Sequence, residues 1–146
     1  MSAPYNHLRI MAFAIVISKE LNCVFIRHEG QMAVTDIPAS FDEILAHPDF
    51  KKGMNILRDS TNAIQPQEYD FNFFQRESPG RLGKYEPFFG KCKLAWVISN
   101  PKEFAIVHRY TIARRMSDDL MERHPFNTIQ AAIDWLGLPA DSEIPI

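Results

Sequence analysis

Cysteine is scarce in this sequence: it occurs only as Cys23 and Cys92, which do not form a CxxC pair. A disulfide-stabilised fold needs several paired cysteines, and a structural zinc site needs several converging thiolate or imidazole ligands. The five histidines add no such ligand set, because none of them is spaced as HxxH or HxxxH. We therefore expect two reduced thiols buried in strands, no metal site and no cofactor.

Long apolar runs and a basic excess are also missing. Residues 11–17 are apolar, but they are far fewer than the roughly 20 residues that cross a membrane, and too few for a signal peptide's core with its cleavage site. We expect a cytoplasmic protein that is neither exported nor inserted into a membrane. The formal net charge is −2 and the pI is about 6.2. Dedicated nucleic-acid binders usually carry a basic excess, so we expect no nucleic-acid partner.

The composition is otherwise that of an ordinary globular domain. The chain has 146 residues, of which 46% are hydrophobic and 23% are charged, close to the average for soluble domains. No internal repeat or linker divides it. We expect a single domain over residues 11–138, with an N-terminal tail at 1–10 and a C-terminal tail at 139–146, in a protein that is a monomer or a homodimer.

Apolar, β-branched runs predict the strands. Residues 12–17 and 23–26 flank a short polar break, as in a β-hairpin. Residues 54–57 and 94–98 are apolar without interruption, which is typical of strands buried on both faces of a sheet. Residues 124–126 form at most an edge strand, because the proline among them cannot donate to a neighbouring strand.

Apolar residues at helical spacing predict four helices. The first lies between Thr35 and Pro48, and the others cover residues 67–77, about 101–120 and 129–136. Thr35 or Asp36 is expected to cap the first helix, Asn100 the third, and Asn127 or Thr128 the last, which Gly137 ends. We expect Trp135 to be largely buried and the segment 78–84, with its proline and glycines, to be mobile.

The order of elements indicates an α/β fold, because strands that alternate with helices form a mostly parallel sheet with right-handed crossovers. The strand that ends in Leu57-Arg58-Asp59, the strand at 94–98, and the ending Phe126 followed by Ala131-Ala132-Ile133-Asp134-Trp135-Leu136 add a further pattern. This pattern resembles the SpoIIAA-like group of the STAS superfamily (sulfate transporter and anti-sigma-factor antagonist), whose fold is related to the Sec14/CRAL-TRIO lipid-binding domains.

The resemblance implies a SpoIIAA-like domain with a four- or five-stranded mixed sheet and helices packed mainly on one face. It also implies a non-enzymatic regulatory or protein-interaction module, and therefore a protein partner. Anti-sigma-factor antagonists carry a phosphorylated serine at the start of the helix after the strand that matches residues 54–59. Residues 64–68 occupy that place here and contain no hydroxyl group of serine or threonine. We therefore expect no phosphoserine switch.

Polar residues at the ends of two predicted strands are the first candidate site. Asp59, Ser60, Thr61 and Asn62 follow one strand, and Ser99 follows the next. In open α/β sheets, ligands bind outside the carboxyl ends of the strands, so these side chains could anchor a polar or phosphorylated group. They also suit a simple turn, because Asp, Ser and Asn readily bond their own backbone.

An aromatic-rich segment, residues 69–89, is the second candidate. Tyr69, Phe73 and Tyr85 could line a pocket for a small apolar or acyl ligand, or they could be core packing beneath a long loop. The sequence contains no nucleophile elbow, P-loop or GxGxxG motif. His108 could be an acid–base group or an ordinary helix residue.

Three functions follow from these candidates. The first is the regulatory or protein-interaction module, and the second is a carrier or sensor of a small apolar ligand. The third is an enzyme that would use Asp59, Ser60 and His108. The enzyme ranks last because no acid, base and nucleophile are linked in the sequence, so we expect no catalytic activity.

Overall fold

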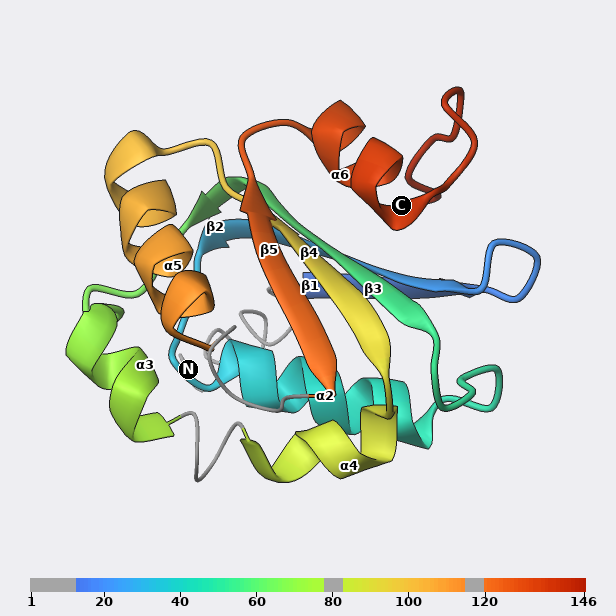
Figure 1. Ribbon diagram of the computed structural model, residues 1–146, viewed down its shortest axis with the longest axis horizontal. Helices are drawn as coiled ribbons and strands as arrows, with labels where there is room; N and C mark the ends of the chain where they lie inside the picture. Colours follow the sequence, from blue (N-terminus) through green and yellow to red (C-terminus); the bar gives the residue numbers. More distant parts are fainter. Residues whose placement is uncertain (1–12, 78–82, 115–119) are drawn as a thin grey trace, which may run out of the picture.

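The computed structural model describes residues 13–77, 83–114 and 120–146 (Figure 1). The predicted N-terminal tail and most of the predicted mobile segment therefore lie outside the described residues. Five strands form one sheet in the order of the sequence: β1 (Phe13–Ser18), β2 (Cys23–Gln31), β3 (Asn55–Ile64), β4 (Cys92–Val97) and β5 (Met121–Phe126). β1 and β2 are antiparallel, and the other neighbouring strands are parallel. The predicted α/β fold with a mixed, mostly parallel sheet is confirmed.

The helices divide unequally between the two faces of the sheet. Those of one face are α2 (Asp36–Ala46), α3 (Phe71–Glu77), α4 (Glu86–Phe89, preceded by the 3₁₀ turn Gly83–Tyr85) and α5 (Pro101–Arg114). α6 (Ile129–Leu136) covers the opposite face, which Figure 1 shows as the helix above the sheet, with α2 and α4 below it. We call these the crossover face and the α6 face. The prediction of helices mainly on one face is confirmed.

Crossover geometry explains this division. Each parallel strand adds to the same side of the one before it, and each connection between parallel strands is right-handed. Right-handed crossovers that advance in one direction place all their helices on the same face. α6 follows the last strand, so it is not a crossover and can fold onto the other face. The apolar strands supply both cores: Ile56 and Leu94 face the crossover helices, and Leu57 and Ala95 face α6.

Local signals define the start of α5 and both ends of α6, as the sequence predicted. Asn100 Oδ1 accepts a hydrogen bond from the Glu103 backbone N–H at 3.0 Å at the start of α5. Thr128 Oγ1 accepts from the Ala131 N–H at 3.2 Å at the start of α6. Gly137 ends α6 with φ +74°, a left-handed conformation that glycine adopts without strain.

Two other helix boundaries differ from the prediction. α3 begins at Phe71 and not at residue 67, because the Asp70 carboxylate accepts from the Phe73 N–H at 2.6 Å and caps the helix there. α5 is described only as far as Arg114, and residues 115–119 lie outside the described part. Leu120 was predicted to continue the apolar stripe of that helix, but it directly precedes β5 and is 45% exposed.

Candidate functional site

The polar stretch after Leu57 is part of a strand and not the predicted loop. β3 continues through Arg58, Asp59 and Ser60, all buried, to Ile64. The β2–β3 register shifts between Arg27 and Glu29, so β3 carries an extra residue there. Buried polar side chains are tolerated in β3 because each of them forms a hydrogen bond with a residue elsewhere in the fold.

Asp59 lies on the α6 face, and both of its oxygens are engaged. Oδ2 accepts from Arg27 Nε at 3.1 Å in an ion pair. Oδ1 accepts from the Thr61 backbone N–H at 3.0 Å and from the Thr61 hydroxyl at 2.5 Å. Arg27 also donates to the backbone carbonyl of Ile146, which ties the last residue of the chain to this face. These contacts give Asp59 and Thr61 a structural role.

The other residues of the first predicted set do not join Asp59. The Ser60 hydroxyl is on the crossover face, where it accepts from Trp96 Nε1 at 3.2 Å. The Ser99 hydroxyl donates to the Thr61 carbonyl at 2.8 Å, which holds the end of β4 against β3. Asn62 is exposed. The structure therefore separates the predicted polar site into strand contacts on two faces.

The aromatic candidates and His108 do not form one site either, because they lie in different surroundings. Tyr85 is buried and donates to Asp42 Oδ1 at 2.8 Å, in contact with the Phe41 ring. Phe73 is half-buried against Tyr69. His108 is half-buried and stacks on Phe104 within α5, with ring centroids 5.7 Å apart. Neither Tyr85, Phe73 nor His108 lines the cleft described next.

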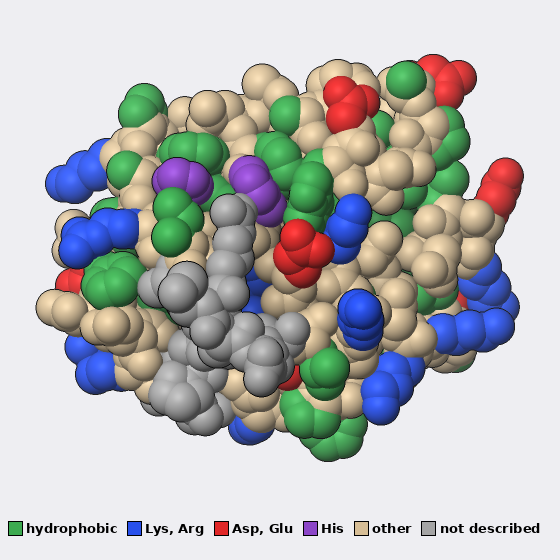
Figure 2. All heavy atoms as spheres, viewed as in Figure 1, with side chains coloured by type: hydrophobic (Ala, Val, Ile, Leu, Met, Phe, Trp, Pro, Cys, Tyr) green, Lys and Arg blue, Asp and Glu red, His purple; other side chains and the backbone are tan. Residues whose placement is uncertain are grey.

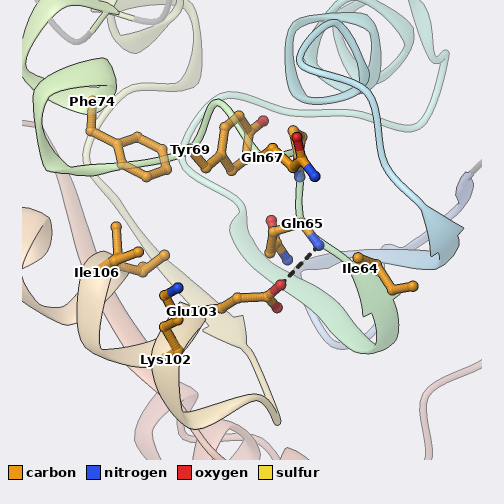
Figure 3. Close-up of a pocket in the computed structure, with 10 residues that line it drawn as sticks. Ile64, Gln65, Gln67, Tyr69, Phe74, Lys102, Glu103 and Ile106 are labelled. Carbon is orange, nitrogen blue, oxygen red and sulfur yellow. Dashed lines mark hydrogen bonds between the residues drawn. The ribbon is translucent and has the colours of Figure 1, made fainter.

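A cleft of about 290 Å³ opens between the chain that follows β3 and the first turns of α5 (Figure 3). We call it the Gln65 cleft. It lies beyond the carboxyl end of β3 and beside the start of α5, where open α/β sheets place their ligands. Its lining comes from both segments: Ile64, Gln65, Pro66, Gln67, Tyr69, Phe74, Lys102, Glu103, Ile106 and Val107.

The side chain of Gln65 is the unusual polar group of this cleft. Gln65 is only 5% exposed, yet neither its Nε2 nor its Oε1 has a hydrogen-bond partner. Its backbone N–H is satisfied, because it donates to Glu103 Oε2 at 3.2 Å, the dashed line in Figure 3. A buried amide without partners costs about 1–3 kcal/mol. The cleft therefore holds a donor and an acceptor that a ligand could satisfy.

The walls of the Gln65 cleft are apolar and consist largely of packed side chains. Tyr69 and Phe74 are buried and pack ring against ring, with centroids 5.0 Å apart. Burial raises the pKa of Tyr69 above its usual range, so the phenol stays protonated and uncharged. Ile106 and Val107 of α5 form the facing wall, and Lys102 supplies a cation at the exposed edge. The arrangement suits a ligand with an apolar body and one polar group.

Tyr69 is the one residue of the predicted sites that lines this cleft. Gln65 was not among the predicted site residues, although it lies in a predicted strand–helix connection next to Pro66. A buried glutamine is hard to recognise from sequence, because glutamine after a strand is usually solvated. Phe74 and Ile106 belonged to predicted helical stripes, and only the packing shows that they also face a cleft.

A second group of buried polar side chains lies deeper on the crossover face. Arg58 Nη1 donates to His28 Nε2 at 2.8 Å and to Ser40 Oγ at 3.1 Å. Its guanidinium also lies over the Phe41 ring, 5.2 Å from the centroid. Burial, reinforced by the neighbouring Arg58 charge, lowers the pKa of His28 to about 3, so the ring is neutral and accepts at Nε2.

Both cysteines are buried, and the part of the chain that the structure describes holds no cluster of metal ligands. Cys23 and Cys92 are free and buried, as predicted, and burial raises the pKa of Cys23 to about 12 and of Cys92 to about 11. Among the described residues, no three His, Cys, Asp or Glu side chains gather as they would around a metal ion. No described helix combines the length and apolarity needed to cross a membrane. On the face drawn in Figure 2, Lys and Arg are spread from end to end.

The fold and the Gln65 cleft together define an α/β domain with a small-molecule-sized cleft at the ends of its parallel strands. No family model and no curated protein matches the chain. Among solved structures, it is similar to an uncharacterized protein of the DUF3478 family with a SpoIIAA-like fold from Shewanella loihica PV-4. The identity is 18% and the TM-score 0.53, over 86% of this chain and 94% of the other. The chain has the SpoIIAA-like fold that its sequence resemblance implied.

Proposed function

We propose that the protein is a non-enzymatic binding module, a carrier or a sensor, that holds a small amphipathic ligand in the Gln65 cleft. The observation that supports this most directly is the buried side-chain amide of Gln65, which has no hydrogen-bond partner at either atom. The cleft volume of about 290 Å³ lies at the lower end of the range for small-molecule sites. The ligand is therefore small, of roughly fragment size.

The chemistry of the cleft specifies the ligand further. Gln65 Nε2 donates and Oε1 accepts, so the polar end of the ligand should carry one acceptor and one donor, as a primary amide does. The apolar body would lie against Tyr69, Phe74 and Ile106. No phosphoserine switch is part of this proposal, because residues 64–70 between β3 and α3 contain no serine or threonine.

Titration with hexanamide tests the proposal. Its six-carbon chain supplies the apolar body, and its amide can pair with Gln65. Binding measured by NMR chemical shifts should weaken about 10-fold in Gln65→Leu, because each unmade hydrogen bond to a buried group costs about 1–3 kcal/mol. Gln75→Leu is the matched control, since Gln75 is exposed on α3 and does not line the cleft. That variant should bind as the wild type does.

Methyl hexanoate separates hydrogen bonding from apolar contact. It has the same chain and an acceptor carbonyl but no hydrogen-bond donor, so it should bind the wild type more weakly than hexanamide and should lose less affinity than hexanamide does in Gln65→Leu. If hexanamide bound the wild type and Gln65→Leu equally well, Gln65 would not recognise the ligand. If it bound neither protein and left the Gln65 and Ile106 signals unchanged, the cleft would not be a site for such ligands.

A protein partner is the second proposal, and exposed Ile64 supports it. Ile64 is 57% exposed at the rim of the Gln65 cleft, where a partner's side chain could cover it. Native mass spectrometry of protein purified from cells tests this. A stoichiometric complex that is lost in Ile64→Asp and retained in Phe88→Asp would support it, because Phe88 is equally exposed, at 62%, on α4. A co-purifying small molecule would support the first proposal instead.

A further inference from the structure

A second, smaller cavity lies on the crossover face, and most of the side chains that line it are buried. Its volume is about 40 Å³. Arg58, Trp96, Tyr110 and Arg123 line it together with aliphatic and aromatic side chains of the core. Phe74 forms part of the walls of both this cavity and the Gln65 cleft, so the two spaces are neighbours but distinct.

The cavity contains a positive charge that the described residues do not balance. Arg58 is 1% exposed, and no described carboxylate lies within ion-pair distance of it. Its Nη1 donates to two uncharged acceptors, and its Nη2 has no partner. Arg123, which also lines the cavity, differs from Arg58 because its Nη2 forms an ion pair with Glu86 at 2.6 Å. Within the described ranges, Arg58 is therefore a buried cation without a paired anion.

Deprotonation does not remove this charge. Burial lowers the pKa of Arg58 only to about 10, so the guanidinium remains charged near neutral pH. A buried charge is costly unless it is paired and hydrogen-bonded. The neutral His28 ring, the Ser40 hydroxyl and the Phe41 face reduce the cost but bring no negative charge. An anion in the adjoining cavity would supply it.

The size of the cavity limits which anion fits. Each water-sized group occupies roughly 10–15 Å³ of such a volume, so 40 Å³ accommodates about three. A carboxylate group has a carbon and two oxygens, which matches this space. Phosphate and sulfate each have five heavy atoms and two further oxygens to solvate, so they are too large. Guanidinium and carboxylate are also complementary in shape, which favours pairing at Nη2.

We propose that this cavity is a buried binding site for a small carboxylate, with Arg58 Nη2 as its anchoring donor. The site is independent of the proposed ligand of the Gln65 cleft. It assigns Arg58, in the middle of β3, to recognition of an anion, with His28 and Ser40 holding the guanidinium in place through Nη1.

The two tryptophans provide an internal test of this site with formate as the probe. Trp96 lines the cavity, whereas Trp135 lies on the α6 face and contacts the Phe126 ring. These are the only tryptophans of the chain. Titration with sodium formate at constant ionic strength, balanced with sodium chloride, should shift the Trp96 indole N–H signal in a saturable way. The Trp135 indole signal should stay in place.

Two variants assign the effect to Arg58. Arg58→Met keeps an unbranched side chain without the charge, and it should weaken formate binding at least about 10-fold. Arg76→Met removes a charge from an exposed position of α3 and should bind formate as the wild type does. If Arg58→Met does not fold, the wild-type comparison of Trp96 with Trp135 still decides.

Three outcomes would overturn the proposal. An unchanged Trp96 signal up to saturating formate would show that the cavity is not a carboxylate site. Equal shifts of Trp96 and Trp135 would indicate a general salt effect. Shifts of Trp96 that chloride produces as strongly as formate would show that carboxylate is not the recognised group.

Discussion

The two faces of the sheet are built differently, although the same three central strands supply both. On the α6 face, mostly small and aliphatic side chains, with the Phe25 ring among them, pack against one helix, and the buried carboxylate of Asp59 is paired with Arg27. On the crossover face, aromatic side chains and four helices form a larger core. That core also contains buried polar atoms of His28, Arg58 and Gln65 that have no partner.

This difference separates stability from recognition. A core that satisfies its polar groups contributes to folding and offers a ligand little. Unpartnered buried groups lower stability, and native proteins contain few of them, so their presence beside two cavities supports the proposal that ligands bind on the crossover face. Variants on each face test that division.

Shortening an α6 side chain should affect stability alone. Ile133 lies on the buried side of α6. Ile133→Ala should therefore lower the free energy of unfolding by ~2–5 kcal/mol, because apolar burial is lost and a cavity is left behind. Urea unfolding measures this. Gln130→Ala, at an exposed position of the same helix, should change it by less than about 0.5 kcal/mol. The folded fraction of Ile133→Ala should bind hexanamide and formate normally, and impaired binding would contradict the division.

The two buried arginine sites should respond with opposite signs. Arg27→Met leaves the buried Asp59 carboxylate without its cation and should destabilise the fold by ~2–3 kcal/mol. Arg58→Met removes an unbalanced charge and, in buffer without carboxylates, should be neutral or stabilising by about 1–2 kcal/mol. Chemical denaturation at neutral pH compares them. Equal destabilisation by both would mean that Arg58 already has its counter-charge.

Acid should lower the stability of the fold, because protonation of His28 favours the unfolded chain. Its folded-state pKa of about 3 lies below the unfolded value of about 6.5, so the unfolded chain takes up the proton first. The contribution of neutral His28 is complete above pH 6.5 and is lost as the pH falls toward 3. Between about pH 7 and pH 4.5, the wild type should lose about 2 kcal/mol more stability than His28→Gln does. Parallel losses would show that His28 is not buried as described.

The smallest effect concerns the rim of the α6 face. Lys93 Nζ lies 5.0 Å from the Trp135 ring centroid and donates to the Trp135 carbonyl at 3.2 Å. Because this side chain is partly exposed, Lys93→Ala should cost only ~0.5–1 kcal/mol. Thermal unfolding and the emission of Trp135 should both change slightly. A cost of several kcal/mol would mean that Trp135 depends on Lys93 for its packing.

The sequence predicted the elements whose signals are local. The caps Asn100 and Thr128, the glycine Gly137 and the apolar spacing of α6 lie within a few residues of the helices that they define. The burial of Trp135 was overestimated: it is half-buried, because it lies at the border of the helix's apolar face beside Phe126. Helical spacing gives the direction of a side chain, but not how far neighbouring elements cover it.

Both proposed binding sites depend on partners distant in the sequence, which local patterns do not reveal. His28 and Ser40 are 30 and 18 residues from Arg58, and Glu103 is 38 residues from Gln65. Arg58 to Asn62 therefore looked like a loop, because their partners in β2, α2 and β4 could not be recognised. The expectation that ligands gather past the carboxyl ends of the strands agrees with the position of the Gln65 cleft. The residues predicted to form a site there were chosen because they are polar and adjacent in the sequence.

The strand order also shapes how the chain can assemble. Each strand pairs with the one synthesised just before it, so the sheet can extend step by step without closing a connection longer than one helical crossover. The crossover core can form as each βα unit is completed. The α6 face has no such order: Phe25 and Leu57 stay bare until the final helix docks. A ribosome-bound chain would thus carry a nearly finished crossover face and an exposed apolar face, which is the surface that chaperones would meet during synthesis.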